Sequence, residues 1–328
     1  MKSRPLVAVV IPAYKVKAHI LDVVSSIGSE VALIVVVDDA CPELSGQHVR
    51  DNITDPRVQV VVHEQNQGVG GAVMTGYRTA MDAGAEIMVK IDGDGQMDPS
   101  LIEAFVMPIT GGYADYTKGN RFYSLENIHR MPAVRIFGNA VLSFMTKLST
   151  GYWDLFDPTN GYTAIHRDAA LVLSMDKISK RYFFETDMLF RLGLVRAKVV
   201  DVPMDAFYGD EVSNLKISKI LGEFLGKHTK NFFKRIFYNY FLRGMSIASL
   251  ELVVGLLIFV FGIAFGTYHW IESAARQVAT PVGTVMISAL SVLCGLQLLL
   301  AFLSFDFASV PRSALHLLRR PHQPRNGD

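Results

Sequence analysis

The sequence contains only two cysteines, Cys41 and Cys294, in 328 residues. They lie far apart, and neither belongs to a Cys-x-x-Cys pair or to a cysteine–histidine cluster with metal-ligand spacing. This scarcity excludes a disulfide scaffold and a structural zinc site. An excess of charge is missing as well, because 32 Lys and Arg residues face 31 Asp and Glu residues, for a net charge of +1. The chain therefore has no global basic field for nucleic acid, and we expect no nucleic-acid partner.

A long apolar stretch is missing near the amino terminus. The apolar run at residues 6–12 is shorter than the core of a signal peptide and leads directly into polar sequence. We therefore expect the first domain to be cytosolic. The mean hydropathy is nevertheless +0.26, and 50% of the residues are hydrophobic. A soluble domain of this size is rarely apolar on average, so the excess must be concentrated elsewhere in the chain.

Two uncharged runs near the carboxyl terminus, Leu252–Tyr268 and Val278–Phe305, hold that apolar excess. Each approaches or exceeds the ~18–20 residues that cross the hydrocarbon core of a bilayer. The alternative is a pair of buried helices in a soluble domain, but little chain remains to bury them. Basic residues flank the outer sides of the two runs: Lys227, Lys230, Lys234, Arg235, Arg243, Arg312, Arg319, Arg320 and Arg325. The connecting segment has no such excess, so the positive-inside rule predicts both ends in the cytosol and the loop outside.

The stretch Ile217–Leu242 alternates apolar side chains with lysines and arginines at helical spacing. Such a helix fits a position in the plane of a membrane surface, and an ordinary domain helix is the alternative. We predict a cytosolic domain at 1–215, amphipathic interfacial helices at 216–243, a transmembrane hairpin at 244–306 and a cytosolic basic tail at 307–328. The protein is then a multi-pass protein of the cytoplasmic membrane. We also expect homo-oligomers formed through the short hairpin.

The first two hundred residues show a different pattern, in which short β-rich apolar runs alternate with helical windows. We predict strands at Leu6–Ile11, Ala32–Val37, Val58–His63 and Ile87–Ile91. Strands that alternate with helices predict an α/β fold with a mostly parallel sheet and helices on both faces. In such folds ligands bind at the carboxyl ends of the strands.

Acidic residues cluster at those predicted strand ends. Asp38 and Asp39 follow the second strand, and Asp92-Gly93-Asp94 follows the fourth. Carboxylates at i and i+2 on extended backbone face the same side, and the glycine between them allows a ligand to approach closely. Two such carboxylates repel each other unless a cation lies between them, and hard oxygen ligands favour Mg²⁺ or Mn²⁺. A D-x-D triplet is common by chance, but in this position it predicts a metal–diphosphate site.

A glycine cluster at residues 66–71 follows the third predicted strand. It matches neither G-x-G-x-x-G nor G-x-x-x-x-G-K-[ST], the two common phosphate-binding loops. Turn chemistry before a helix is therefore the alternative to a phosphate-binding role.

Seven runs of the sequence together resemble one known family. They are VAVVIPAYKVKAHI, VVVDDACPE, NQGVGGAVMTGYRTA, KIDGDGQMDP, KGNRF, DPTNGYTAIHRDA and YFFETDMLFRL, and they cover almost all of residues 5–215 in order. This pattern resembles a family 2 glycosyltransferase of the GT-A fold. More narrowly, it is similar to the polyprenyl-phosphate glycosyltransferases related to dolichol-phosphate mannose synthase. The resemblance implies a Rossmann-like GT-A catalytic domain, and the hairpin suits the membrane-anchored branch.

The resemblance also implies donor and metal roles at matching positions. Asp38 and Asp39 resemble the acidic pair near the nucleotide base and ribose, whereas Asp92, Asp94 and Gln96 resemble the D-x-D-x-Q site for metal and donor phosphates. Asp92 and Asp94 would then hold Mg²⁺ or Mn²⁺. The predicted donor-binding residues are Pro12, Tyr14, Asp38, Asp39, Gly71, Asp92 and Gln96.

Catalytic and acceptor roles follow from three further motifs. Arg121 in KGNRF is similar to the family arginine that contacts phosphate, and Asp157 in DPTNGY matches the aspartate near the sugar and the acceptor. The predicted catalytic residues are Asp94, Asp157 and Arg121. The predicted acceptor-binding residues are Arg121, Arg135, Glu185, Asp187 and Lys216. A surface cation is the alternative for Arg121, and helix-terminus electrostatics is the alternative for the two acidic residues of FFETD.

The resemblance implies transfer of a sugar, with inversion, from a UDP- or GDP-sugar to a polyprenyl phosphate such as undecaprenyl or dolichyl phosphate. A lipid monophosphate is already ionised near neutral pH, since its second pKa is ~6 by analogy with phosphoamino acids. Such a nucleophile needs positioning more than deprotonation. The alternatives are a processive polysaccharide synthase, whose Q-x-x-R-W motif the sequence lacks, and a catalytically silent, membrane-anchored nucleotide-binding protein.

Overall fold

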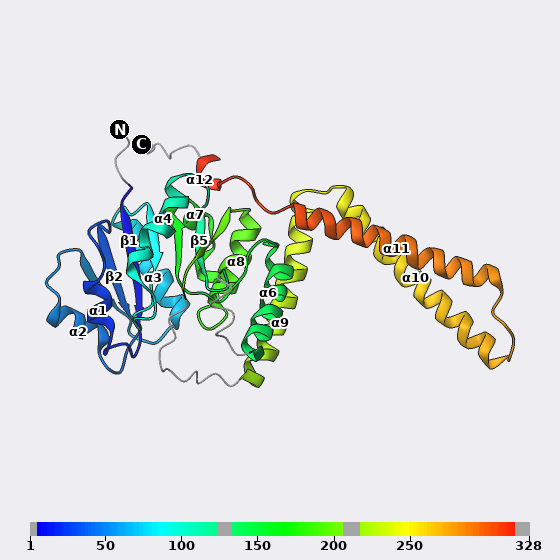
Figure 1. Ribbon diagram of the computed structural model, residues 1–328, viewed down its shortest axis with the longest axis horizontal. Helices are drawn as coiled ribbons and strands as arrows, with labels where there is room; N and C mark the ends of the chain where they lie inside the picture. The colour runs from blue at the N-terminus through cyan, green and yellow to red at the C-terminus, as the bar shows by residue number, and fades with distance from the viewer. Residues whose placement is uncertain (1–4, 124–132, 206–216, 319–328) are drawn as a thin grey trace. The chain divides into compact units, whose positions relative to one another are not determined.

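The computed structural model describes residues 5–123, 133–205 and 217–318, with the backbone alone at 133–135 and 217–221 (Figure 1). The chain forms two compact units. The first contains the chain up to Asn231 together with the segment from Pro311 onward, and the second runs from Phe232 to Val310. The predicted boundaries after residues 215, 243 and 306 divide the chain more finely than this and stay predictions.

A seven-stranded sheet of order β3-β2-β1-β4-β6-β5-β7 forms the centre of the first unit. The strands are β1 (Val7–Ala13), β2 (Leu33–Asp38), β3 (Val58–Val62), β4 (Ile87–Lys90), β5 (Tyr116–Asn120), β6 (Thr163–His166) and β7 (Val199–Pro203). β6 is antiparallel to β4 and β5, and the other neighbouring strands pair in parallel. The predicted mostly parallel sheet is therefore confirmed.

Helices cover the sheet on both faces (Figure 1). The helices of the first unit are α1 (Ile20–Ser25), α2 (Ser45–Asn52), α3 (Val69–Asp82), α4 (Ile102–Thr110), α6 (Ala133–Thr150), α7 (Arg167–Val172), α8 (Phe184–Val195) and α12 (Leu315–Leu318), with 3-10 turns η1 (Pro99–Leu101) and η2 (Met175–Lys177). Helix α9 (Ile217–Phe237) begins in the first unit and ends in the second. α3 packs closely on β1 because Gly76 has no side chain. A Cβ at Gly76 would lie 2.2 Å from Val10 Cγ1.

The reversed strand β6 decides which loops meet at one edge of the sheet. Thr163, at the start of β6, is the register partner of both Lys90 in β4 and Lys118 in β5. The loop that precedes β6 therefore lies beside the segments that follow β4 and β5. Three stretches far apart in sequence, after residue 90, after residue 120 and before residue 163, converge at the carboxyl-end edge of the parallel strands.

The second unit contains two long helices, α10 (Ile247–Ala275) and α11 (Val282–Ala308). Both are long and apolar enough to cross a membrane, as the hydropathy pattern predicts. They pack tightly along a line of glycines, since a Cβ at Gly295 would lie 2.5 Å from the backbone nitrogen of Phe259. The expected pair of apolar helices near the carboxyl terminus is thus present as a packed hairpin, a candidate for two membrane spans, whereas its predicted bounds stay predictions.

A buried charge pair closes the base of this hairpin. Asp306, in the last turn of α11, accepts hydrogen bonds from Arg235 Nη1 at 2.6 Å, from Arg235 Nη2 at 3.0 Å and from the Tyr240 hydroxyl at 2.6 Å. Tyr240 belongs to the π-helical turn η3 (Tyr238–Arg243) that precedes α10. The sequence analysis counts Arg235 among the basic residues that flank the apolar runs. The structure shows that Arg235 is also the counter-ion of Asp306.

Candidate active site

A buried lysine lies among the acidic residues at the end of β4. The Lys90 ammonium nitrogen is 2.8 Å from Asp92 Oδ1 and 3.7 Å from Glu185 Oε1, and only 1% of the Lys90 side chain is exposed. Asp92 and Glu185 thus face the same ammonium group. A Cβ at Gly161, in the loop before β6, would lie 2.4 Å from Lys90 Nζ, so this loop approaches the cluster at backbone distance.

Asp94 and Asp92 supply oxygen atoms that suit a hard divalent cation. Asp94 Oδ1 accepts a hydrogen bond from the Gln96 amide at 3.0 Å, which shapes the turn that follows β4. Within the described residues no group of three His, Cys, Asp or Glu side chains has metal-binding geometry. Mg²⁺ is commonly bound by one or two carboxylates together with substrate phosphates and water. The two aspartates fit a cation that a bound diphosphate completes.

The acidic pair at the end of β2 is held by hydrogen bonds within the protein. Asp38 accepts from the backbone amides of Cys41 at 2.7 Å and Gly46 at 2.6 Å. Asp39 accepts from the backbone amides of Gln67 at 2.8 Å and Gly68 at 2.7 Å, and its Oδ1 lies 2.7 Å from His63 Nδ1. These contacts join the ends of β2 and β3 to the start of α3, so the predicted donor residues also organise their own edge of the sheet.

The other predicted donor residues occupy different environments. Pro12 belongs to β1, and Tyr14 directly follows it with an exposed ring. Gly71 is buried in the first turn of α3, where a Cβ would lie 2.5 Å from the Gln67 side chain. Gly71 is therefore required by local packing, whatever its role toward a ligand.

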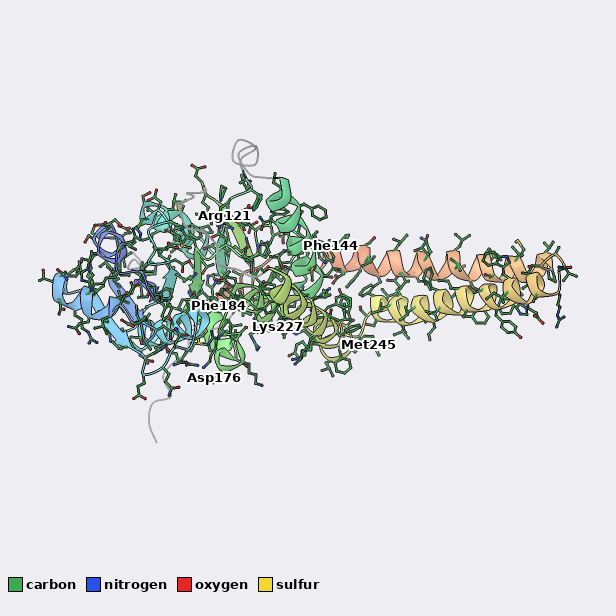
Figure 2. The ribbon with its side chains drawn as sticks, turned by 90° about the horizontal axis from the view of Figure 1, so that it is seen from below. Arg121, Phe144, Asp176, Phe184, Lys227 and Met245 are labelled. Carbon is green, nitrogen blue, oxygen red and sulfur yellow. The ribbon has the colours of Figure 1, made fainter. Side chains whose placement is uncertain are left out.

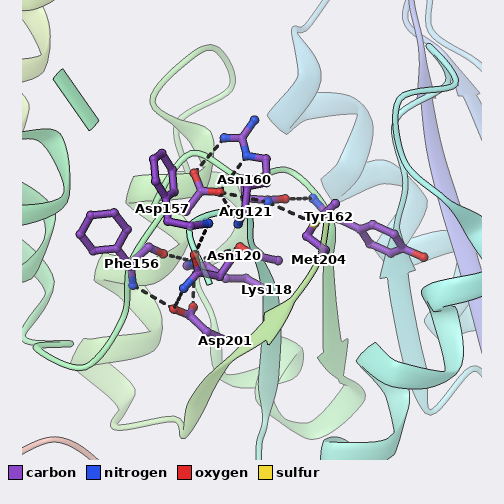
Figure 3. Close-up of polar contacts among 11 residues, drawn as sticks. Lys118, Asn120, Arg121, Phe156, Asp157, Asn160, Tyr162, Asp201 and Met204 are labelled. Atoms are coloured by element: carbon purple, nitrogen blue, oxygen red, sulfur yellow. Dashed lines mark hydrogen bonds and ion pairs between the residues drawn. The ribbon is translucent and has the colours of Figure 1, made fainter. Parts of the chain in front are cut away.

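Arg121 and Asp157 form a bidentate ion pair across 36 residues of sequence (Figure 3). Arg121 Nε and Nη2 each lie 2.8 Å from an oxygen of Asp157, and the Arg121 amide donates to the same carboxylate at 3.2 Å. The Asp157 side chain has no exposed surface, whereas 26% of the Arg121 side chain is exposed. A fully buried carboxylate thus fixes a guanidinium that remains accessible.

The environment of Asp157 keeps it ionised. Burial by itself would raise the pKa of Asp157, but the hydrogen bonds and charge of Arg121, together with the charge of Lys118, lower it below the ordinary value. Asp157 also has a positive φ of 50°, a conformation that aspartate and asparagine tolerate better than most residues. A carboxylate of lowered pKa, already paired with arginine, is a poor proton acceptor.

The predicted acceptor residues do not all come together. Glu185 faces Lys90, but Asp187 accepts from the Ser179 amide at 2.8 Å and from Arg191 Nε at 3.1 Å. Asp187 therefore stabilises the start of α8, and its hydrogen-bond partners differ from the Lys90 ammonium that Glu185 faces. Lys216 and the side chain of Arg135 lie outside the described residues.

Four residues of the site carry no role in the sequence prediction. They are Lys90, Lys118, Asn120 and Asp201. The sequence carries a signal for Lys90, which stands inside the apolar run predicted as a strand at Ile87–Ile91, but none for Lys118, whose strand β5 has no apolar run. A buried lysine is rare unless a carboxylate pairs with it, so such a lysine marks an unseen acidic partner.

Helix α6 is built with its polar side inward. Phe137, Val141 and Phe144 are 73%, 41% and 56% exposed, and their spacing places them on one face of the helix. Figure 2 labels Phe144 on this helix. The buried face carries Ser143, Thr146, Ser149 and Thr150. Ser149 lies 2.9 Å from His228 Nδ1 of α9, so the two helices are neighbours within the first unit. A helix of this kind presents an apolar stripe to its surroundings instead of to the protein core.

Comparison with known proteins identifies the relatives of this fold. The Glycosyl transferase family 2 model matches residues 8–172. The UDP-N-acetylglucosamine--dolichyl-phosphate N-acetylglucosaminyltransferase of Methanococcus voltae is 30% identical over 217 residues, which are 62% of this chain and 86% of that protein. The undecaprenyl-phosphate mannosyltransferase of Micrococcus luteus is 30% identical over 193 residues, which are 58% of this chain and 78% of that protein.

The fold itself recurs in a solved structure. Glucosyl-3-phosphoglycerate synthase from Mycobacterium tuberculosis, in complex with Mn²⁺, UDP and glucosyl-3-phosphoglycerate, matches with a TM-score of 0.52 at 20% identity. The match covers 70% of this chain and 80% of that one. Together with the family match, this likeness confirms the predicted GT-A fold class.

Proposed function

The chain belongs to glycosyl transferase family 2, and we propose that it transfers a sugar from a UDP- or GDP-sugar to a polyprenyl phosphate, with inversion. The two relatives named above carry polyprenyl-phosphate acceptors in their names, which supports the acceptor class. The observation that carries the proposal is the fixed Arg121 guanidinium, which shares one sheet edge with Asp92 and Asp94.

In this proposal the charged side chains of the site bind phosphate, either directly or through a cation or a neighbouring side chain. Asp92 and Asp94 would hold Mg²⁺ or Mn²⁺, and a cation there would neutralise charge on the departing nucleoside diphosphate. Arg121, oriented by Asp157, binds a phosphate oxygen of the acceptor through its exposed edge, the role predicted for it as an acceptor-binding residue. The lipid phosphate is already anionic, so no side chain has to remove a proton from it. Placement of the two anions is then the main task of the site.

The apolar stripe of α6 supports a lipid acceptor. Phe137, Val141 and Phe144 would rest on hydrocarbon at a membrane surface, while α10 and α11 anchor the chain in the bilayer. The proposed location is the cytoplasmic membrane, with the catalytic domain and both termini on the cytosolic side, as the distribution of basic residues predicts.

The direct test is a product analysis. The purified full chain, in vesicles that contain undecaprenyl phosphate, would be incubated with a panel of UDP- and GDP-sugars, and the lipids analysed by mass spectrometry. We expect a polyprenyl monophosphate sugar with one donor of the panel. Hydrolysis of a sugar nucleotide without any lipid product, or transfer to a hydroxyl acceptor only, would contradict the proposal.

Replacement of Phe137 and Phe144 by serine is expected to lower sugar transfer to a lipid in a bilayer but not transfer to a water-soluble acceptor. Full burial of a phenylalanine in an apolar environment contributes roughly 1.5–3 kcal/mol, so Phe137→Ser/Phe144→Ser should weaken transfer to undecaprenyl phosphate in vesicles at least about tenfold. Transfer to a short, water-soluble isoprenyl phosphate should stay unchanged. Tyr113→Ser, an exposed aromatic outside α6, is the control and should match wild type in both assays. Equal loss with both acceptors would contradict a membrane role for the stripe.

A further inference from the structure

A second ion pair lies beside Arg121 and Asp157, between β5 and β7. Lys118 and Asp201 are register partners on these strands, and Lys118 Nζ is 2.8 Å from Asp201 Oδ1. The ammonium also donates to the carbonyl oxygens of Gly119 and Phe156. Both side chains are largely buried, so the pair has little solvent screening. Lys118 is the first residue of the KGNRF run but carries no predicted role, and Asp201 lies outside all seven runs.

Asp201 holds the two chain segments that carry the Arg121–Asp157 pair. Its Oδ2 accepts from the Phe156 amide at 2.9 Å and from Asn120 Nδ2 at 3.0 Å (Figure 3). Phe156 directly precedes Asp157, and Asn120 directly precedes Arg121. One carboxylate oxygen therefore fixes the residue before each member of the pair.

The end of β7 adds further ties to the same two segments. The Met204 amide donates to the Asn120 carbonyl at 3.2 Å, and Asn160 Nδ2 lies 3.3 Å from Met204 Sδ. Asn160 Nδ2 also donates to Asp157 Oδ2 at 3.2 Å. Because Asp157 has a left-handed backbone conformation, its geometry depends on such surrounding contacts.

We propose that Asp201 is a positioning residue for sugar transfer, which fixes the direction in which the Arg121 guanidinium meets phosphate. Lys118 neutralises Asp201, so the four side chains alternate in charge along the network. Asp201 touches no reacting group in this proposal and acts only through the backbone and Asn120. The proposal rests on the phosphate-binding role of Arg121 stated above. It predicts that the hydrogen-bond acceptor at position 201 matters more for catalysis than its charge.

Two double variants separate the acceptor from the charge. Lys118→Met/Asp201→Asn removes both charges and keeps a side-chain oxygen for Phe156 and Asn120, whereas Lys118→Met/Asp201→Leu removes that oxygen as well. Both avoid an unpaired buried charge, which would destabilise the fold by itself. We expect the asparagine version to stay within about threefold of wild type in kcat/KM for the lipid phosphate. The leucine version should be about 10–100-fold lower, the usual scale for a misplacement of about 1 Å, with KM for the sugar nucleotide unchanged.

The decisive experiment combines each of the two double variants with Arg121→Gln/Asp157→Asn, which replaces the ion pair by two neutral side chains. If Asp201 acts through Arg121, then in that background Lys118→Met/Asp201→Leu should show no further loss relative to Lys118→Met/Asp201→Asn, in activity or in affinity for farnesyl phosphate. A loss of equal size in both backgrounds would overturn the proposal, and so would equal activity of the two versions in the native background. Wild-type activity of Arg121→Gln/Asp157→Asn would instead contradict the proposed role of Arg121 itself.

Asp115 provides the matched control. It is a buried aspartate at the opposite end of β5, and its carboxylate accepts from the Lys198 amide at 2.8 Å, so it also links β5 to β7. Asp115→Asn and Asp115→Leu should lower the melting temperature as the position 201 variants do. They should leave kcat/KM per folded molecule unchanged. A fall in kcat/KM with Asp115→Leu as large as with Lys118→Met/Asp201→Leu would reduce the role of Asp201 to ordinary stabilisation of the strands.

Discussion

Asparagine in place of Asp94 is expected to lower turnover at least about 100-fold and to leave the fold intact. The substitution keeps the size of the side chain and the oxygen that accepts from the Gln96 amide, and it removes one negative charge. A divalent cation contributes several kcal/mol to the stabilisation of a departing diphosphate, and each 1.36 kcal/mol corresponds to a factor of ten in rate. Because Asp94→Asn removes half of the carboxylate charge at the predicted cation site, we expect kcat to fall. The measurement is steady-state turnover over a range of Mg²⁺ and Mn²⁺ concentrations, with circular dichroism as the test of folding.

Asp98→Asn is the control for this substitution. Asp98 stands in the same segment, and its carboxylate accepts from the Ser100 amide at 2.9 Å, a contact that asparagine can keep. We expect wild-type turnover from it. Asp92→Asn should be equal to Asp94→Asn or milder. It should also lower stability, because among the described residues the Lys90 ammonium then keeps one carboxylate neighbour, Glu185 at 3.7 Å. Wild-type turnover by folded Asp94→Asn would contradict the metal assignment.

The strands of the first half of the chain could be predicted because their apolar runs are local. The structure places β1 at Val7–Ala13 and β3 at Val58–Val62, within two residues of the predicted ends. Each run is bounded by polar or turn-forming residues, and the pattern alternates with helical windows. Such signals need no knowledge of distant contacts.

The partners of the site could not be predicted, because they come from distant parts of the chain. Arg121 and Asp157 meet only because β6 runs antiparallel between β4 and β5, and no local pattern reports the direction of a strand. Asp201 reaches Asn120 across 81 residues of sequence. The resemblance predicted roles for Arg121 and Asp157 separately but not the ion pair that makes each depend on the other.

Amphipathic patterns posed a second difficulty, because they show two faces without telling which is buried. α6 has an apolar stripe, and a core-facing stripe would be the ordinary expectation. The structure buries its serines and threonines and exposes Phe137 and Phe144. The ion pair between Arg235 and Asp306 was not predicted either. Asp306 stands directly after the uncharged run that ends at Phe305, and its partner lies 71 residues away in the sequence.

Asparagine at position 157 is expected to lower turnover about 10–100-fold through misplacement of Arg121. Asparagine tolerates the positive φ of 50° and can still accept one hydrogen bond, but it cannot form the bidentate ion pair. Alanine would add backbone strain at this φ, so asparagine is the cleaner substitution. The measurement is the pH dependence of kcat under saturating donor for wild type and Asp157→Asn.

The acidic limb of that pH profile should be the same in both proteins. The pKa of Asp157 in the folded protein lies below its ordinary value, so the ion pair stabilises the fold at neutral pH and is lost only as the pH falls through that lowered pKa. The penalty of Asp157→Asn in the free energy of unfolding should therefore be full near pH 7 and shrink in strong acid. A limb near pH 6 would belong to ionisation of the acceptor phosphate, whose second pKa is ~6. If Asp157→Asn abolished the acidic limb, Asp157 would be the general base, and the role of holding Arg121 would be wrong.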